Sequence, residues 1–507
     1  MTDDETNDFN AKRESNGGLR PLKRLPSFVP GFDDILCGGL VEGSSYIVQG
    51  DPGTGKTILA NQLAFALARR GDKTLYMTLL SESFTQMFGF LQSIAFFDMS
   101  EVSRRIWYSS VFTTVREEGF ASLLKLIHRE IRTHSPTMIV IDGVFILDEL
   151  KVDPNATHDF RRFLNDLTAL TSQSGVTLLL LTNSSRKPSS PEYTMVDGWI
   201  ELSDDLEAES PRRFLCVHKH RGGPILRGQH DYRISDTGFT VYPKLETLAP
   251  RTPNRKTSEG ALSTGIDSLD TMLCGGFPAE SATALVGPTG SGKTTIGMQY
   301  LAASTPDEKG LFFGFYESPD RICKRADKIG VKLRPLVDSG VVKMIWQPPF
   351  DNILDDLGRQ IVEAVVEHGA KRVVIDGLNA LQRPLNEKAR LHGFLRALNQ
   401  LIAAAGATIV YTREVPQLFF PSVLSNDDLS GLIDNTILLH YELSDGAIGQ
   451  RIGILKVRDS DFDHRSLPFQ ISSGGMTIDL SLGAGRMNRG GETAGGGQPA
   501  SGQGAGS

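Results

Sequence analysis

The chain has 507 residues, enough for two to four domains at about 150 residues each, and its 40% hydrophobic and 22% charged residues are typical of globular proteins. This composition excludes disorder over the whole chain. A net charge of −7 argues against a protein that coats nucleic acid non-specifically, because such proteins need a strongly positive face.

Membrane insertion and secretion also lack support in the sequence. No apolar run approaches the roughly 20 residues of a membrane-spanning helix, and the first residues are polar and acidic, unlike a secretory signal. The four cysteines form no Cys-x-x-Cys pair, which argues against a zinc site or a disulfide framework. We therefore expect a cytoplasmic protein with no membrane contact and no structural metal.

Short Val/Ile/Leu-rich runs alternate with helical stretches along the chain. Strands are predicted at 44–50, 74–80, 138–142, 176–183, 281–287, 310–316, 373–378 and 407–412, and helices at 57–70 and 294–304. Near-continuous apolar strands alternating with helices are typical of parallel sheets covered on both faces. The predicted fold class is α/β with central, mostly parallel sheets, and ligands are expected at the carboxyl ends of the strands.

Three segments of the chain recur in the same order. Leu36–Gly39 returns as Leu273–Gly276, and GDPGTGKT at 50–57 returns as GPTGSGKT at 287–294, both at an offset of 237 residues. MIVIDG at 138–143 returns as RVVIDG at 372–377, at an offset of 234. The chain is therefore predicted to be a tandem repeat of two homologous domains.

The expected domain boundaries follow from composition. A disordered leader is predicted at 1–20, the first domain at 21–246, a proline-containing polar linker at 247–258 and the second domain at 259–481. Residues 482–507 should form a flexible glycine-rich tail, because 10 of the last 25 residues are glycine and almost none is apolar.

Two GxxxxGK[ST] segments each lie between a predicted strand and a helix, which is the context of a phosphate-binding loop. Their backbone N–H groups should bind phosphate oxygens, the lysines the β- and γ-phosphates, and the threonines Mg²⁺. The predicted ATP-binding residues are Gly50, Asp51, Pro52, Gly53, Thr54, Gly55, Lys56 and Thr57, and Gly287, Pro288, Thr289, Gly290, Ser291, Gly292, Lys293, Thr294 and Thr295.

Asp142 and Asp376 end apolar strands downstream of the two loops. An acidic side chain at such a strand end can hold Mg²⁺ together with Thr57 or Thr294. The alternative is a helix-capping or turn aspartate, because a glycine follows each.

Phosphoryl transfer also needs a group that orients or deprotonates the incoming oxygen. Glu317 ends the predicted strand after the second loop helix and is the candidate base there. Aligning the repeats places Ser81 opposite Glu317, so Glu82 lies one residue out of register and faces the other side of an unbulged strand. Each glutamate has a capping or surface role as its alternative.

Late in each repeat a Lys-x-Arg spacing recurs, as Lys219 and Arg221 and as Lys456 and Arg458. On a strand both cations point to one face, where they could bind the phosphates of ATP on a neighbouring subunit. The alternative is an exposed basic edge strand that opposes aggregation.

With these motifs in tandem, residues 21–480 resemble the KaiC family of bacterial clock-type ATPases, a double-domain branch of the RecA/DnaB-type P-loop ATPases. The resemblance implies two RecA-like domains, a double-ring homohexamer with ATP and Mg²⁺ between subunits, and an unidentified signalling partner protein. It also implies slow ATP hydrolysis in the first ring and Ser/Thr autophosphorylation in the second.

The family residues carry over unevenly. The loop residues, strand-end aspartates and Lys-x-Arg cations all match. The family has two adjacent glutamates after the second strand of each domain, whereas this chain has Tyr316-Glu317 and Leu80-Ser81 there. Ser430 falls on the phosphoacceptor serine, Gly431 replaces the neighbouring acceptor threonine, and Ser425 matches an auxiliary hydroxyl. A two-site phosphorylation cycle is therefore not expected.

Two other functions stay open at this point. The first is a DNA-dependent recombinase or helicase-type motor, suggested by one basic cluster: Arg212, Arg213, His218, Lys219, His220, Arg221 and Arg227. The chain has a net charge of −7 and lacks an added DNA-binding motif, so nucleic acid is a weak candidate partner. The second is a non-catalytic scaffold that ATP assembles by mass action.

Overall fold

A computed structural model of the chain describes residues 22–79, 84–143, 156–183, 190–205, 211–249, 260–348, 352–382, 388–416, 431–444, 446–458 and 460–481. The predicted leader and tail, most of the predicted linker, and the site candidates Glu82 and Ser430 lie outside these residues.

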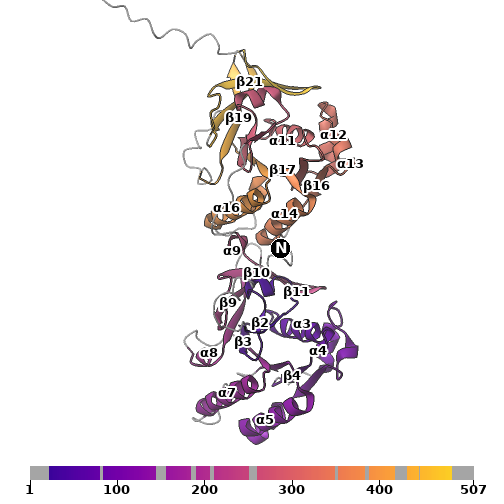
Figure 1. The fold of residues 1–507 in the computed structure, drawn as a ribbon, viewed down its shortest axis with the longest axis vertical. Coiled ribbons are helices and arrows are strands. Elements are labelled where there is room, and N and C mark those ends of the chain that lie inside the picture. The colour runs from indigo at the N-terminus through magenta and orange to yellow at the C-terminus, as the bar shows by residue number, and fades with distance from the viewer. Residues whose placement is uncertain are drawn as a thin grey trace, which may run out of the picture. The chain divides into compact units, whose positions relative to one another are not determined.

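The chain divides into two compact units, Met1–Leu248 and Ala249–Ser507, each built on one nine-stranded sheet (Figure 1). The elements of the first unit are β1 (Arg24–Leu25), α2 (Phe32–Ile35), β2 (Leu40–Val41), β3 (Ser45–Gly50), α3 (Lys56–Arg69), β4 (Thr74–Thr78), α4 (Phe84–Leu91), β5 (Ile106–Ser110), α5 (Phe112–His134), β6 (Met138–Asp142), α7 (Ala156–Gln173), β7 (Thr177–Thr182), α8 (Glu192–Met195), β8 (Gly198–Asp205), β9 (Arg212–His220), β10 (Gln229–Ser235), β11 (Gly238–Tyr242) and α9 (Leu245–Leu248).

The large sheet of the first unit has the order β11-β10-β9-β8-β3-β7-β6-β4-β5. The strands from β8 to β5 pair in parallel, and β8 to β11 pair antiparallel. The predicted α/β class with a mostly parallel sheet is confirmed. Because β3, β7 and β6 run in parallel, their carboxyl ends meet at one edge of the sheet.

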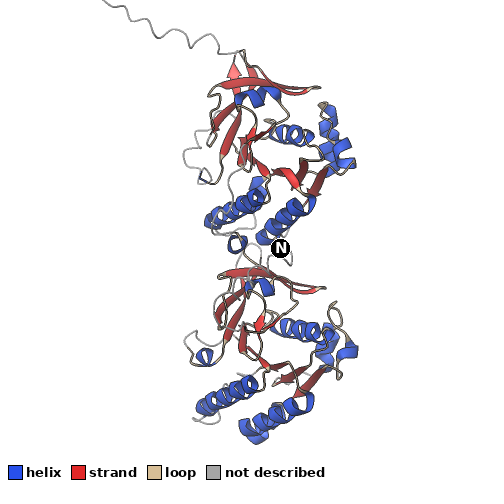
Figure 2. Ribbon diagram, viewed as in Figure 1, coloured by secondary structure: helices blue, strands red, loops and turns tan. Residues whose placement is uncertain are grey.

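Both faces of this sheet are covered by helices (Figure 2). Along β6, Met138 and Val140 pack with α3 in one core, whereas Ile139 and Ile141 pack with α5 and α7 in the other. This period of two is why the strand reads as continuously apolar. Among the described helices, none is long and apolar enough to cross a bilayer.

The second unit repeats the arrangement, with the sheet order β16-β15-β17-β18-β14-β19-β20-β21-β22. Its elements are β12 (Ala261–Leu262), α10 (Asp267–Met272), β13 (Phe277–Pro278), β14 (Ala282–Gly287), α11 (Lys293–Ala302), β15 (Lys309–Gly314), α12 (Pro319–Lys328), α13 (Arg334–Asp338), β16 (Val342–Trp346), α14 (Leu354–His368), β17 (Ala370–Asp376), α15 (Leu378–Gln382), α16 (Lys388–Ala404), β18 (Thr408–Glu414), β19 (Asn435–Ser444), β20 (Ala447–Lys456), β21 (Ser466–Ser472) and β22 (Gly475–Ile478).

Several strand ends differ from their predictions by one to three residues, and the difference at the end of β15 decides where Glu317 lies. The sequence pattern carries the strand to Tyr316, but β15 ends at Gly314, where its last residue pairs with Asp376 of β17. The partner strand stops there because Gly377 turns the chain with a φ of 110°. Residues beyond Gly314 therefore have no ladder to join, and Glu317 lies in the turn before α12 rather than on the strand.

A neutral histidine joins the end of β9 to the two-stranded sheet of β1 and β2 in the first unit. The Arg24 guanidinium on β1 lies 2.7 Å from His220 Nε2, and Tyr46 Oη lies 3.4 Å from His220 Nδ1. Burial, with the Arg24 charge, lowers the pKa of His220 to about 4. Protonation would place two cations in contact and break the Arg24 hydrogen bond.

We predict that this contact makes the stability of the first unit pH-dependent. A lowered folded-state pKa contributes stability above the unfolded value of about 6.5, which is lost as the pH falls towards about 4. His220→Val, which installs the residue of the second repeat, Val457, should flatten this dependence. Urea unfolding between pH 4.5 and 7.5 measures it, with the exposed His128→Val as control. Equal slopes for His220→Val and the unsubstituted chain would contradict the assignment.

Candidate functional site

The two phosphate-loop segments adopt the same backbone geometry. Each connects the end of a central strand, β3 or β14, to the following helix, and the N-cap glycines Gly55 and Gly292 have φ values of 93° and 98°. A Cβ on Gly50 would lie 2.5 Å from the Leu202 carbonyl oxygen, and Gly287 has an equivalent clash. Only glycine lets these loops turn this tightly in front of the helix N-terminus.

Each loop lysine donates hydrogen bonds to carbonyl oxygens of its own loop. Lys56 Nζ donates to the carbonyl oxygens of Gly50 (2.7 Å) and Asp51 (3.0 Å), and Lys293 Nζ donates to those of Gly287 (2.8 Å) and Pro288 (2.7 Å). Burial lowers the pKa of both lysines, while nearby carboxylates oppose the shift. A partly desolvated ammonium group in a glycine loop is a favourable partner for a phosphate oxyanion.

The threonine and aspartate predicted to hold Mg²⁺ meet in both units. Thr57 Oγ1 donates to Asp142 Oδ2 at 3.2 Å, and Thr294 Oγ1 donates to Asp376 Oδ1 at 3.2 Å. Each threonine is the second residue of its loop helix, and each aspartate is the last residue of a parallel strand two places away in the sheet. The shared carboxyl edge of the sheet therefore brings them together.

These oxygen atoms fit a magnesium–nucleotide complex. Carboxylate and hydroxyl oxygens are the hard ligands that Mg²⁺ prefers. In the described part of the chain no three His, Cys, Asp or Glu side chains are placed to hold a metal ion together, so Mg²⁺ would take its other ligands from phosphate oxygens and water. In the second loop the buried Ser291 hydroxyl has no hydrogen-bond partner, which leaves a polar group there for a ligand to satisfy.

Glu317, the candidate base of the second unit, is held by an arginine that the sequence analysis missed. Arg325 of α12 donates to Glu317 Oε1 at 2.8 Å. Burial raises the pKa of Asp376, while Arg325 lowers it and Glu317 raises it, so both charges act on the strand-end carboxylate. The structure thus groups Glu317, Arg325 and Asp376 at one end of the sheet. Glu82 lies outside the described residues.

The Lys-x-Arg pairs sit at equivalent strand ends but already have partners within the chain. Lys219 Nζ donates to the carbonyl oxygens of Tyr193 (2.9 Å), Thr194 (3.2 Å) and Val196 (2.6 Å), around α8. Arg221 lies 3.6 Å from Asp197.

The second unit places its pair in the same way. Lys456 Nζ donates to the Ile433 carbonyl oxygen at 2.8 Å, and Arg458 lies 2.8 Å from Asp434. The two aspartates recur at the 237-residue offset, a signal from which the sequence alone could have identified them.

Both strand ends also carry the same bulge. The register shifts between Trp199 and Ile200 in the first unit and between Thr436 and Ile437 in the second, just where each lysine pairs. A bulge adds one residue to one strand and re-aims the side chains beyond it. The lysine direction is therefore set by the backbone in both units.

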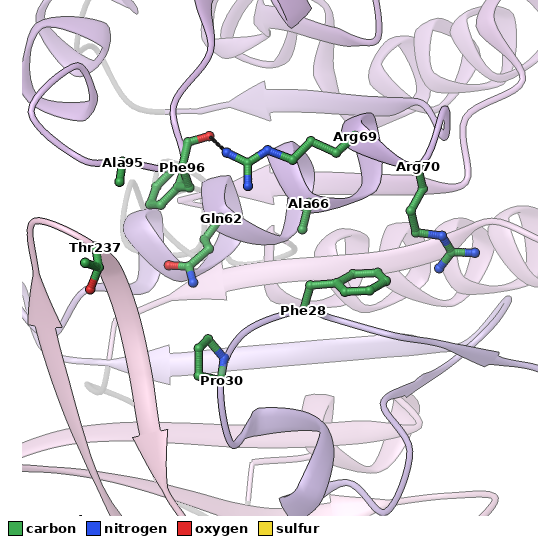
Figure 3. A pocket seen from close by; sticks show the side chains of 9 residues that line it. All are labelled: Phe28, Pro30, Gln62, Ala66, Arg69, Arg70, Ala95, Phe96 and Thr237. Carbon is green, nitrogen blue, oxygen red and sulfur yellow. Dashed lines mark hydrogen bonds between the residues drawn. The ribbon is translucent and has the colours of Figure 1, made fainter. Parts of the chain in front are cut away.

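A separate cavity of about 370 Å³ lies along the later turns of α3, away from the loop (Figure 3). Arg69 donates to the Phe96 carbonyl oxygen there at 3.0 Å, and the Arg70 guanidinium lies 5.7 Å from the centre of the Phe28 ring. None of the predicted ATP-binding residues lines this cavity.

Comparison with known proteins agrees with this geometry. The family model "ATPase: KaiC" matches residues 25–246 and 262–482. The circadian clock oscillator protein KaiC of Parathermosynechococcus lividus is 26% identical over 475 residues, which is 91% of this chain and 86% of that protein. The protein of the same name from Picosynechococcus sp. is 25% identical over 485 residues, 92% of each chain. The family resemblance is thus confirmed, and the chain belongs to the KaiC family of ATPases, with the family's ATPase domain present twice in tandem.

Proposed function

We propose that this chain binds Mg²⁺–ATP in both domains, hydrolyses it slowly and assembles into a homohexamer with ATP between neighbouring subunits. The observation that carries the proposal is the duplicated site. Two glycine loops of equal geometry each place a lysine and a Thr–Asp pair, with 3.2 Å between the paired oxygens, at the carboxyl edge of a parallel sheet.

In each domain the N-terminus of the loop helix binds phosphate oxygens through its backbone N–H groups. Lys56 or Lys293 exchanges its loop carbonyl partners for the β- and γ-phosphates. The Thr–Asp pair orients Mg²⁺, which, when bound, neutralises charge on the phosphates. In the second domain, Glu317 accepts the proton of the attacking hydroxyl or water.

Assembly requires cations from the adjoining subunit in this proposal. Each unit has one pair of such cations at the end of a strand: Lys219 with Arg221, and Lys456 with Arg458. In the proposal each pair contacts the phosphates of ATP bound to the neighbouring subunit. Their bonds to backbone carbonyls and aspartates must be exchanged for phosphate contacts. ATP bound at such a junction stabilises the ring by mass action.

The DNA-motor alternative has less support. Four of the seven basic side chains in its cluster form ion pairs within the first unit: Arg212–Asp231 (2.6 Å), Arg213–Asp204 (3.2 Å), His218–Glu201 (2.7 Å) and Arg221–Asp197 (3.6 Å). Paired cations contribute little to counterion release from a phosphate backbone. We expect an ATPase rate unchanged by single-stranded DNA; a several-fold stimulation would favour the motor.

Removal of either loop lysine should remove one nucleotide per chain. Native mass spectrometry of Lys56→Ala and of Lys293→Ala with Mg²⁺–ATP should show one bound nucleotide where the unsubstituted chain shows two. The exposed Lys125→Ala and Lys328→Ala are matched controls in the two units. A monomer at saturating ATP, or two nucleotides on both loop variants, would contradict the proposal.

The base assignment is tested by Glu317→Gln. Because a positioned base typically contributes about 10²- to 10⁴-fold, turnover in the second domain should fall by that order in a Lys56→Ala background. Glu363→Gln, on the exposed side of α14, should leave turnover unchanged. If Glu317→Gln turns over ATP as fast as its parent, the base assignment is contradicted, and the hypothesis of a non-catalytic scaffold assembled by ATP is favoured.

Autophosphorylation is proposed for the second domain, with Ser430 as acceptor. Incubation with γ-labelled ATP should label the chain, and Ser430→Ala should remove the label, because Gly431 offers no second acceptor hydroxyl. The exposed Ser339→Ala, in the same unit, is the matched control and should keep the label. Undiminished labelling of Ser430→Ala would assign the acceptor elsewhere.

A further inference from the structure

The two strand-end aspartates accept hydrogen bonds from different side chains. In the first unit Tyr76 on β4 donates its hydroxyl to Asp142 Oδ2 at 3.0 Å. In the second unit Thr412 on β18 donates its hydroxyl to Asp376 Oδ1 at 2.6 Å. The aspartates end β6 and β17, which are the middle strands in the equivalent orders β7-β6-β4 and β18-β17-β15. Tyr76 lies on β4 and Thr412 on β18, so the two hydroxyls reach their aspartates from opposite sides.

Each unit has one of these hydroxyls and lacks the other. Strand register places Phe312 where the first unit has Tyr76, and Leu181 where the second unit has Thr412. Both replacements are fully buried and carry no donor. A hydroxyl beside the aspartate is therefore kept in both units although its position in the sheet is not.

Both hydroxyls are constrained to donate to the carboxylate. Tyr76 is 0% exposed, and its hydroxyl proton is directed to Asp142 Oδ2 inside the core. Thr412 Oγ1 accepts from the Gly377 backbone N–H at 2.8 Å, which directs its single proton towards Asp376. In the first unit the Gly143 N–H donates instead to the Leu181 carbonyl oxygen.

We propose that Tyr76 and Thr412 are positioning residues for Mg²⁺, each fixing the carboxylate of its own domain beside the loop threonine. The inference rests on the proposed function, because it requires Mg²⁺ to bind at these aspartates. Partners that orient a metal-binding carboxylate without touching the metal commonly change metal affinity by about 10- to 100-fold. A merely structural role would instead affect folding and nucleotide binding with or without Mg²⁺.

The test measures Mg²⁺ dependence in one domain at a time. Full-length chains carrying Lys293→Ala report on the first domain, and those carrying Lys56→Ala report on the second. The readout is the Mg²⁺ midpoint for binding of a fluorescent non-hydrolysable ATP analogue, with the affinity in EDTA measured in parallel. Tyr76→Phe and Thr412→Val remove one hydroxyl each, and Thr412→Ser is the conservative control.

We expect Tyr76→Phe to raise the Mg²⁺ midpoint of the first domain about tenfold and to leave the second unchanged, and Thr412→Val to do the reverse. Thr412→Ser should retain the original midpoint, and affinities in EDTA should not change. An unshifted midpoint, or an equal loss with and without Mg²⁺, would overturn the inference. If Thr412→Val does not fold, the Tyr76→Phe comparison decides alone. Failure of both parent chains to bind the analogue would instead refute the proposed function.

Discussion

The candidate site of each domain depends on one contact, a threonine hydroxyl at the start of a helix that meets a carboxylate at the end of a strand. The distance is 3.2 Å in each unit. Neither side chain is long, so the contact forms only if helix and sheet are held in a narrow range of positions. Packing supplies that constraint, because α3 lies on one face of the sheet and its partner helices α5 and α7 cover the other. Hydrogen bonds to charged groups contribute about 1.5–3 kcal/mol, so the packing of the core, rather than this bond, carries the arrangement.

The two repeats keep the backbone and change the side chains around it. The loop glycines, the bulges on β9 and β20 and the strand orders agree between the units. The donors to the aspartates do not agree, since a tyrosine serves one unit and a threonine the other. Glu317 and Arg325 form an ion pair in the second unit, whereas the sequence of the first unit has Ser81 and Gly89 at the aligned positions. A duplicated fold can thus hold one site geometry while its chemistry diverges.

The Lys-x-Arg strand ends combine charge with restraint. Three backbone carbonyls surround the Lys219 ammonium, and an aspartate faces Arg221. In the proposed ring a neighbouring phosphate must compete with these bonds, so net affinity comes from the difference between two sets of contacts. Arg221 is one of four basic side chains in this region that have a carboxylate partner within the first unit, so the region carries less net positive charge than its sequence indicates.

The α/β class, the duplication, the loops, the strand-end position of both aspartates and the family were all accessible from the sequence, because they depend on local periodicity and on residues close together in the chain. The tertiary structure decided which distant groups meet. Tyr76 and Thr412 gave no signal, since the repeats carry Phe312 and Leu181 at those positions and only strand order brings the hydroxyls to the carboxylates. Arg325 likewise meets Glu317 only because β15 stops early at Gly314 and the chain turns into α12. Contacts across a sheet depend on register and on where neighbouring strands end, and no single segment of sequence encodes either.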